Sequence, residues 1–519
     1  MSNISSSSRT APAVAESSGP VTKRTRIVGP DNTTSTASDN ADEHEVKSLF
    51  VQLQSMQGEP LGPKLDIPAS ATQAQLSQLI NKLLQTPADE SVPYTFYINE
   101  VELAKNLINH VTLNKISTET EIVVKYQPLE RFHVRAVTRC TDTLEGHQGA
   151  VLHLSFSPNG KYLVSGGGDN LVRFWDTDTA APINDCRGHK NHVLATAWCP
   201  NGQKFATGDK SGKLFVWSPT SPKPLTTLRG HKKWVTAIVW EPMHRNKTCE
   251  RFATSSNDGT VKIWNSRTGK CEVSMTAHQS SVEALCWGGQ GFLYSGSRDR
   301  MVGVWAVEGP SKGTLVRLLK GHGHRINTLA LSCDHVCRSG PFTYKQTRFD
   351  TQDAAYDAAL KLYTKHSAGS AERLVSGSDD FTIFLWEPTK SKKPIARLTG
   401  HQQLIFCLRF SPDGRFIASA SADKKVKLWD GFTGKFITTF HGHVGAVYRL
   451  VWSPDSRLLA SGSKDSTCKL WPIKNSRHTG NASHTLPGHA DEVYALDWSP
   501  NGARVASGSK DRTVKIWRN

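Results

Sequence analysis

The sequence predicts a mainly β protein in which a small α+β domain precedes an eight-bladed β-propeller. Two observations lead to this fold class. A unit spaced mostly by 42 to 47 residues recurs eight times over the last three quarters of the chain. A period of that length is typical of repeated supersecondary units arranged in rings or stacks. Ahead of the repeats, residues 45–128 carry strand and helix patterns in a different order.

The repeats are marked by three residue types at fixed places. A Gly-His pair opens seven units, with Ala277-His278 in the fourth, and a tryptophan follows 28 residues after the histidine in five units. An aspartate stands six residues before the tryptophan in seven units, whereas the second unit has Ser211 there. The recurring residues are His147, His189, His231, His278, His322, His401, His443 and His489; Asp169, Asp258, Asp299, Asp380, Asp423, Asp465 and Asp511; and Trp175, Trp217, Trp264, Trp305, Trp386, Trp429, Trp471 and Trp517.

Short β-forming runs separated by turn residues fill each unit. The seventh unit shows them as AVYRLVWS, a turn at 454–457, LLASGS and CKLW. Such runs predict short antiparallel strands, and a closed ring of four-stranded blades protects most strand edges. The last unit ends at Trp517-Arg518-Asn519 without an outer strand. We therefore expect residues 135–144, which lie just before the first repeat, to complete the final blade.

The recurring histidine, hydroxyl and aspartate superficially match a hydrolase triad. Eight copies around a ring do not make eight active sites, so we expect a hydrogen-bond network among His, Asp, Ser/Thr and Trp instead. Over roughly 390 residues this pattern resembles the WD-repeat family, which implies that the network is structural. A literal Trp-Asp pair survives at Trp175-Asp176 and Trp429-Asp430.

The fifth unit contains an insertion. Its histidine and tryptophan are 64 residues apart, and the excess falls at about 333–372. Residues 351–366 place alanines and a leucine near helical spacing, with Thr351 or Asp353 as a cap. The insertion is interpreted either as a partner-docking element or as a tolerated surface loop, and the sequence leaves both open.

The first quarter of the chain predicts a tail and a docking module. Residues 1–44 are rich in Ser, Thr, Asn and Asp and predict a disordered tail, with a weak basic targeting cluster at 23–26. The domain at 45–128 looks like a ubiquitin-like domain, and it lacks a terminal Gly-Gly. A linker at 129–139 leads to the propeller at 140–519. The strands of the small domain are expected at 46–53, 63–67, 94–98 and 121–126, and its amphipathic helix at 72–84.

Composition narrows the class of function. The net charge is +17 and uneven: residues 1–44 carry −1, residues 45–128 carry −3, and residues 129–519 carry +21. A basic propeller attracts polyanions, RNA above all. No apolar run of about 18 residues or signal peptide is present, and the ten scattered cysteines indicate reduced thiols. Without a P-loop, metal quartet or nucleophile motif, we expect a non-enzymatic scaffold with no cofactor, metal or membrane contact of its own.

Three phrases then identify a closer resemblance. A ubiquitin-like domain followed by FHVRAVTRC at 132–140 and eight repeats, with GSDDFT at 377–382 and PGHADEVY at 487–494, resembles the Notchless family from about residue 45 to the end. The resemblance implies an assembly factor of the large ribosomal subunit in the nucleus, mainly the nucleolus and nucleoplasm. The implied partner is the pre-ribosomal particle, with its ribosomal RNA, ribosomal proteins and other assembly factors.

The resemblance also implies a second partner, the AAA ATPase midasin. In that family the ubiquitin-like domain binds midasin's metal-ion-dependent adhesion site, and a glutamate completes the coordination of Mg²⁺ held by the partner. Mg²⁺ takes oxygen ligands in an octahedral shell, so a carboxylate offered by another protein can replace a water. Alignment of the short strand and the following Glu-Leu-x-x-x-Leu favours Glu102. Glu100 is the second choice, since it shares a face with Glu102 in an extended segment, and both remain compatible with ordinary solvated acids.

Two other functions compete with ribosome assembly. The family name suggests a signalling adaptor that modulates the Notch pathway. A WD-type substrate receptor of a ubiquitin ligase is disfavoured, because no F-box-like helix pair precedes the propeller. The sequence does not indicate which blades or which propeller face contact RNA or protein, or at which stage of assembly.

Overall fold

The computed structural model describes residues 48–56, 58–85, 94–99, 101–103, 106–114, 121–128, 134–345, 347–367, 371–473 and 484–518. The chain divides into two compact units, 1–47 and 48–519, and the described residues all belong to the second. The tail expected at 1–44, its basic cluster and Glu100 lie outside the described residues.

The N-terminal module is a five-stranded sheet in the order β2-β1-β5-β3-β4. Strands β1 and β5 pair in parallel, and the other pairs are antiparallel. Side chains from β1, β3, β5 and α1 form its core. The elements are β1 (Ser48–Ser55), β2 (Leu65–Pro68), α1 (Gln73–Leu83), β3 (Tyr94–Ile98), β4 (Val101–Glu102), α2 (Leu107–Leu113) and β5 (Ile122–Pro128).

Helix α1 follows from its sequence. Thr72 begins it with a capping box completed by Gln75, and Leu76 and Ile80 are buried against the sheet. This confirms the helix expected at 72–84, and β1, β2, β3 and β5 confirm the four expected strands. Strand β4 and helix α2 were not predicted, because two and seven residues are too few to establish a period.

The described residues from 139 onward form eight four-stranded antiparallel sheets, which are the blades. Blades 1 to 4 contain β7 (Val151–Phe156), β8 (Tyr162–Gly167), β9 (Val172–Asp176), β10 (Pro182–Cys186); β11 (Val193–Trp198), β12 (Phe205–Asp209), β13 (Leu214–Trp217), β14 (Thr226–Leu228); β15 (Val235–Trp240), β16 (Arg251–Ser256), β17 (Val261–Asn265), β18 (Cys271–Met275); β19 (Val282–Trp287), β20 (Phe292–Ser297), β21 (Met301–Ala306) and β22 (Leu315–Lys320).

Blades 5 to 8 continue the ring. They contain β23 (Ile326–Leu331), β24 (Leu374–Ser378), β25 (Ile383–Trp386), β26 (Ala396–Leu398); β27 (Ile405–Phe410), β28 (Phe416–Ser421), β29 (Val426–Asp430), β30 (Phe436–Phe440); β31 (Val447–Trp452), β32 (Leu458–Ser463), β33 (Cys468–Pro472), β34 (His484–Leu486); β35 (Val493–Trp498), β36 (Val505–Ser509), β37 (Val514–Arg518) and β6 (Arg139–Leu144). Helices α3 (Asp334–Ser339) and α4 (Gln352–Ser367) lie between β23 and β24.

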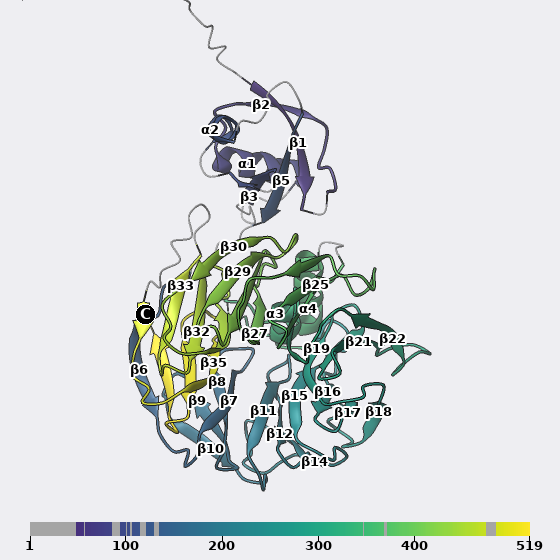
Figure 1. The fold of residues 1–519 in the computed structure, drawn as a ribbon, viewed down its shortest axis with the longest axis vertical. Helices are drawn as coiled ribbons and strands as arrows, with labels where there is room; N and C mark the ends of the chain where they lie inside the picture. Colours follow the sequence, from purple (N-terminus) through teal and green to yellow (C-terminus); the bar gives the residue numbers. More distant parts are fainter. Residues whose placement is uncertain are drawn as a thin grey trace, which may run out of the picture. The chain divides into compact units, whose positions relative to one another are not determined.

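The first strands of neighbouring blades pack against one another, and β35 packs against β7 to close the ring (Figure 1). The second strands of the blades are the most buried: β28 and β32 are buried along their whole length, and β8, β16 and β20 are buried except at their first residue. Burial on both faces follows because each blade is covered by the blades before and after it. The mainly β fold with an eight-bladed propeller and a small α+β domain is confirmed.

Strand β6 closes the ring from the other end of the chain. It pairs antiparallel with β37, with Leu144 opposite Val514 and Cys140 opposite Trp517. In Figure 1 the blue β6 lies beside the yellow strands at the C-terminus. This confirms that the residues before the first repeat complete the final blade.

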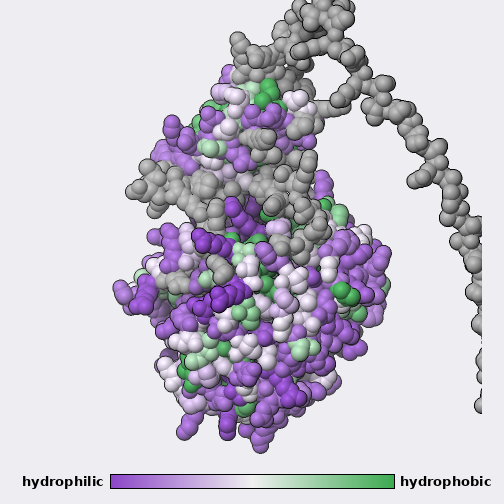
Figure 2. Space-filling model, turned by 90° about the vertical axis from the view of Figure 1, so that its left-hand side faces the viewer, coloured by the Kyte–Doolittle hydropathy of each residue, from purple (hydrophilic) through white to green (hydrophobic). Residues whose placement is uncertain are grey.

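No helix in the described part of the chain is long and apolar enough to span a bilayer. The face seen in Figure 2 is largely hydrophilic, with small separate apolar patches. All ten cysteines are free thiols, and eight of them are buried.

Candidate functional site

A buried hydrogen-bond network joins the recurring histidine, aspartate and tryptophan of each repeat through a serine or threonine hydroxyl. In blade 6, His401 Nδ1 lies 2.8 Å from Asp423 Oδ2, and His401 Nε2 lies 2.7 Å from Ser419 Oγ. The Trp429 indole N–H donates to the same Ser419 oxygen at 2.9 Å. The serine hydroxyl therefore donates to the imidazole and accepts from the indole, so each group is satisfied.

Every blade repeats this arrangement. The distance from His Nδ1 to Asp Oδ2 lies between 2.8 and 3.0 Å in all eight. The hydroxyl in the middle comes from the second strand: Ser165, Thr207, Thr254, Ser295, Ser376, Ser419, Ser461 and Ser507. Eight buried, fully bonded copies fasten the turns of the blades to their cores and offer no open position for a substrate.

In blade 2 the acid of the network is one that the repeat spacing did not identify. Asp209 is fully buried and accepts from His189 Nδ1 at 2.9 Å, whereas the six-residue spacing to the tryptophan that holds in the other units leads to Ser211. Its other oxygen accepts from the Ser211 hydroxyl and backbone. This carboxylate lies two residues closer to the N-terminus than in the other repeats, so the fixed spacing of six residues to Trp217 did not identify it.

The network holds its carboxylates ionised. Burial alone would raise the pKa of Asp423, but hydrogen bonds from His401 and two backbone N–H groups outweigh it and lower the pKa to about 2. The same balance lowers the pKa of Asp511 to about 2. Burial also lowers the pKa of His489, against the opposing effect of Asp511, so this imidazole stays neutral at physiological pH.

Substitution of Asp423 by Asn is expected to lower the free energy of unfolding by about 1–2 kcal/mol at pH 7, through loss of charge-assisted hydrogen bonds. The folded-state pKa lies below the unfolded value of about 3.9. The carboxylate therefore stabilises the fold above that pH, and the stabilisation is lost as the pH falls towards about 2. Urea denaturation from pH 7 to pH 3 should show the difference between wild type and Asp423→Asn shrinking with acidity. A difference that stays constant would contradict this account, and exposed Asp357→Asn is the control.

The candidate glutamate lies at an edge of the N-terminal module. Strand β4 pairs with β3, with Glu102 opposite Tyr97, across a turn in which Asn99 has a φ of 47°. Leu103, the next residue, is fully buried and donates its N–H to the Phe96 carbonyl at 2.8 Å. Glu102 thus ends the outermost strand of the sheet, at a position fixed by a core residue.

The insertion in blade 5 crosses one end of the propeller. Thr351 Oγ1 accepts from the Ala354 N–H at 3.2 Å, which confirms the expected helix and its cap. The insertion contacts blades 8 and 2, through Arg338 to Asp497 at 3.7 Å and Gly340 against Pro200. It also contacts blades 3 and 6, through Gln352 to the Lys247 carbonyl at 2.7 Å and His366 to the Pro412 carbonyl at 2.8 Å. It is therefore packed as part of the ring and is not a free loop.

One buried carboxylate fastens the insertion to blade 4. Glu372 Oε1 accepts from the backbone N–H groups of Gly289 and Gln290 at 2.5 and 3.0 Å. The Tyr294 hydroxyl donates to Glu372 Oε2 and the Tyr363 hydroxyl to Oε1, each at 3.1 Å. Burial and then the Glu372 charge raise the pKa of Tyr294, so its hydroxyl remains a donor. Only 3% of Glu372 is exposed, and these donors replace the water that it loses.

The comparisons with known proteins agree with this architecture. Residues 49–111 match the NLE (NUC135) domain family. The WD domain, G-beta repeat, matches residues 138–176, 180–218, 222–265, 269–306, 392–430, 434–472 and 480–518. The first three strands of the fifth blade, between which the insertion lies, fall outside these matches although the blade has the same strands and network. The chain is thus a WD-repeat propeller protein with an NLE domain.

Several curated relatives match most of the chain. The chain is 47% identical over 406 residues to a Notchless protein homolog of Arabidopsis thaliana, covering 77% of this chain and 83% of the relative. It is 42% identical to Protein Notchless of Drosophila melanogaster, with 72% and 77% covered. It is also 42% identical to Ribosome assembly protein 4 of Saccharomyces cerevisiae, with 76% and 80% covered. The chain belongs to the Notchless family.

A solved structure shares the fold. The crystal structure of the computationally designed Ika8 protein superimposes with a TM-score of 0.56 at 28% identity, covering 73% of this chain and 98% of the designed one. A designed relative of this kind supports the fold and says nothing of function.

Proposed function

We propose that this protein is a non-enzymatic scaffold and assembly factor for the large ribosomal subunit. The observation that carries the proposal is the similarity to the yeast protein named Ribosome assembly protein 4, which extends over 76% of this chain. The eightfold buried network supports a scaffold, because its polar groups satisfy one another. The proposed location is the nucleus, mainly the nucleolus and nucleoplasm.

The charge of the propeller favours a ribonucleoprotein partner. Residues 129–519 account for all the excess positive charge of the chain, and such a surface gains affinity for RNA by releasing condensed counterions. The proposed partners are ribosomal RNA, ribosomal proteins and other assembly factors in the pre-ribosomal particle.

Gradient sedimentation with crosslinking tests this role. The full-length protein is expected to co-sediment with large-subunit precursors and to crosslink to ribosomal RNA or protein through the propeller. Sedimentation free of these particles would instead favour the signalling adaptor that the Notchless name suggests.

We further propose that the N-terminal module docks on the AAA ATPase midasin, with Glu102 offering a carboxylate to Mg²⁺ held by the partner. An edge strand with its end fixed by buried Leu103 suits this task, since Mg²⁺ accepts little variation around about 2.0–2.1 Å. Force from the ATPase can then reach the propeller and the particle through the module. Glu100 remains the second choice.

Glu102→Asp is expected to weaken binding of the full-length protein to the Mg²⁺-loaded midasin adhesion-site domain by at least about tenfold, roughly 1.4 kcal/mol. The shorter side chain withdraws the carboxylate by one methylene while keeping its charge. Calorimetry or a pull-down measures the effect, and Glu59→Asp on the exposed turn after β1 is the matched control. Unchanged affinity for Glu102→Asp together with a loss for Glu100→Asp would transfer the role to Glu100.

A further inference from the structure

A cavity of about 790 Å³ occupies the middle of the propeller. The first strands of the blades line it, and small side chains at equivalent positions leave it open: Ala195, Ala237, Ala284 and Ala495. A cavity of this size lies within the range of sites that enclose a small ligand, about 300–1,000 Å³.

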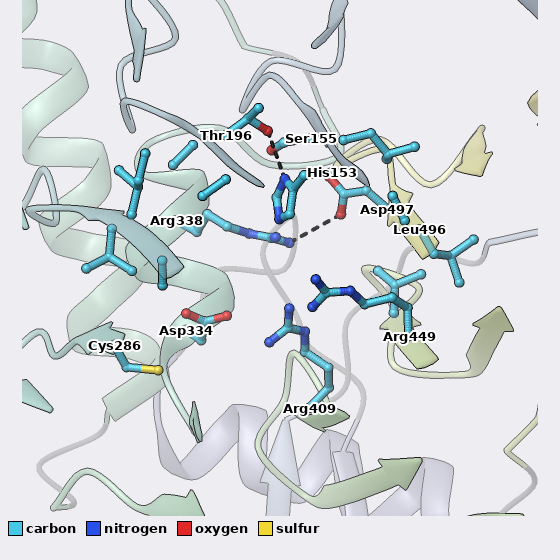
Figure 3. A pocket seen from close by; sticks show the side chains of 18 of the residues that line it. His153, Ser155, Thr196, Cys286, Asp334, Arg338, Arg409, Arg449, Leu496 and Asp497 are labelled. Atoms are coloured by element: carbon cyan, nitrogen blue, oxygen red, sulfur yellow. Dashed lines mark hydrogen bonds and ion pairs between the residues drawn. The ribbon is translucent and has the colours of Figure 1, made fainter. Parts of the chain in front are cut away.

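Two arginines from neighbouring blades enter this cavity. Arg409 comes from β27 and Arg449 from β31, and Figure 3 shows their guanidinium groups pointing toward one another. A bulge between Val447 and Arg449 in β31 turns consecutive side chains, Tyr448 and Arg449, to the cavity. The position of the pair is therefore built into the strands and does not depend on a loop.

Neither arginine has a carboxylate partner within 4.0 Å among the described residues. Arg449 Nε–H donates to the Tyr494 carbonyl at 3.3 Å, and Arg409 makes one long contact of 3.5 Å to the Leu408 carbonyl. Most of their N–H donors thus remain available to a ligand. Arg338 of α3 adds a third guanidinium, 3.7 Å from Asp497.

The cavity lining balances three arginines, Arg338, Arg409 and Arg449, against three acids, Glu283, Asp334 and Asp497. Burial would lower the pKa of Arg409, but Cys407 and the carboxylates of Asp334 and Asp497 outweigh it and raise that pKa, so the guanidinium stays charged. Burial lowers the pKa of Arg449; Cys407 partly opposes this, and the charge of Arg409 lowers the pKa further. Burial and then Arg449, Arg409 and Arg338 lower the pKa of His153 to about 3, so this imidazole is neutral. Like charges facing one another in a buried site are unfavourable, and an anion between them offsets that cost.

The two ends of the cavity differ. At one end, α3 of the insertion and the turn prolines Pro158, Pro200 and Pro500 line it. At the other, Phe406, Tyr448 and Tyr494 come from three successive blades, with ring centroids 5.1 and 5.8 Å apart. The end near α3 holds Arg338 beside Asp334 and Asp497, and the other end is aromatic. The guanidinium pair of Arg409 and Arg449, together with this aromatic end, suits a ligand that carries a phosphate and a flat ring.

We propose that the central cavity binds a phosphorylated nucleotide, with the phosphate between Arg409 and Arg449 and the base against Phe406, Tyr448 and Tyr494. Guanidinium groups present paired N–H donors that match phosphate oxygens. The nucleotide comes either from solution or from an RNA strand that extends its terminal nucleotide into the mouth. The inference goes beyond the role in ribosome assembly and does not depend on it.

Binding to the full-length protein tests the proposal, with nucleoside 5′-monophosphates, the unphosphorylated nucleosides, and a short RNA with and without a 5′-phosphate as probes. We expect the phosphorylated probes to bind at least tenfold more tightly than their unphosphorylated counterparts. A preference confined to the RNA identifies an RNA end as the source, and equal binding of the monophosphate identifies a free nucleotide.

Arg409→Gln and Arg449→Gln are each expected to weaken binding of the phosphorylated probe by at least tenfold, while Arg298→Gln, exposed on a turn of blade 4, leaves it unchanged. Tyr494→Leu should weaken binding of the base and keep the preference for phosphate, and it provides a readout if the arginine variants fail to fold. Equal binding of probes with and without phosphate would overturn the proposal, and so would unchanged affinity in folded Arg409→Gln. It would also be overturned if a glutamate-rich peptide displaced the probe at a lower concentration than inorganic phosphate does.

Discussion

A chain that begins at residue 145 is expected to lose the cooperative unfolding of the propeller, whereas a chain that begins at Val134 keeps it. The shorter chain lacks β6, which supplies the outer strand of blade 8. Its removal exposes the edge of β37 and the row of unpaired backbone groups along it. The longer chain also keeps Val137, which is fully buried, and the Thr138 N–H bond of 2.9 Å to the Arg518 carbonyl.

Thermal unfolding followed by circular dichroism measures the difference. We expect the melting temperature of the chain from 145 to fall by roughly 10 °C or more, or the protein to aggregate, because several kcal/mol of stability are lost. If the two chains have the same melting temperature, β6 does not contribute to the stability of the closed ring, and the prediction is wrong.

The second large effect is expected at Glu372. Glu372→Leu should lower the free energy of unfolding by about 3–5 kcal/mol, because it leaves several buried hydrogen-bond donors unsatisfied at about 1–3 kcal/mol each. The backbone N–H groups of Gly289 and Gln290 lose their acceptor, and so do the hydroxyls of Tyr294 and Tyr363. Glu372→Gln keeps one acceptor oxygen and should cost less.

Urea denaturation measures both variants, with Asp350→Asn in an exposed part of the same insertion as the control. Loss of stability should be accompanied by earlier proteolysis within 333–372, since Glu372 ties the insertion to blade 4. If the insertion is cleaved no faster than in the wild type, Glu372 stabilises the ring without holding the insertion in place, and this part of the prediction is wrong.

The fold could be read from the sequence where its determinants are local and repeated. His401, Asp423 and Trp429 recur in register with seven other sets because each blade solves the same packing problem. Asp209 was not predicted, because the network requires a carboxylate close to the histidine and not at one fixed position in the sequence. A carboxylate two residues earlier in the chain still lies within hydrogen-bond distance of His189. Strand β4 was not predicted for a different reason. A strand of two residues has no pattern of its own and is defined only by its pairing with β3.

The features that depend on the ring as a whole could not be predicted. The path of the insertion rests on contacts with blades far apart in sequence, such as His366 with the Pro412 carbonyl. Arg409 and Arg449 read as ordinary basic residues of two strands. Their proximity follows from the order of the blades and from the bulge in β31, and neither leaves a distinctive local pattern.

The pairing of β6 with β37 also sets the order of events during synthesis. Thr143 and Lys515, which bond across these strands, are 372 residues apart. At about 5–20 residues per second, the ribosome needs on the order of 20–75 s to make the intervening chain. Throughout that interval the growing ring has two open edges, and it becomes a closed circle after residue 518 has left the ribosome.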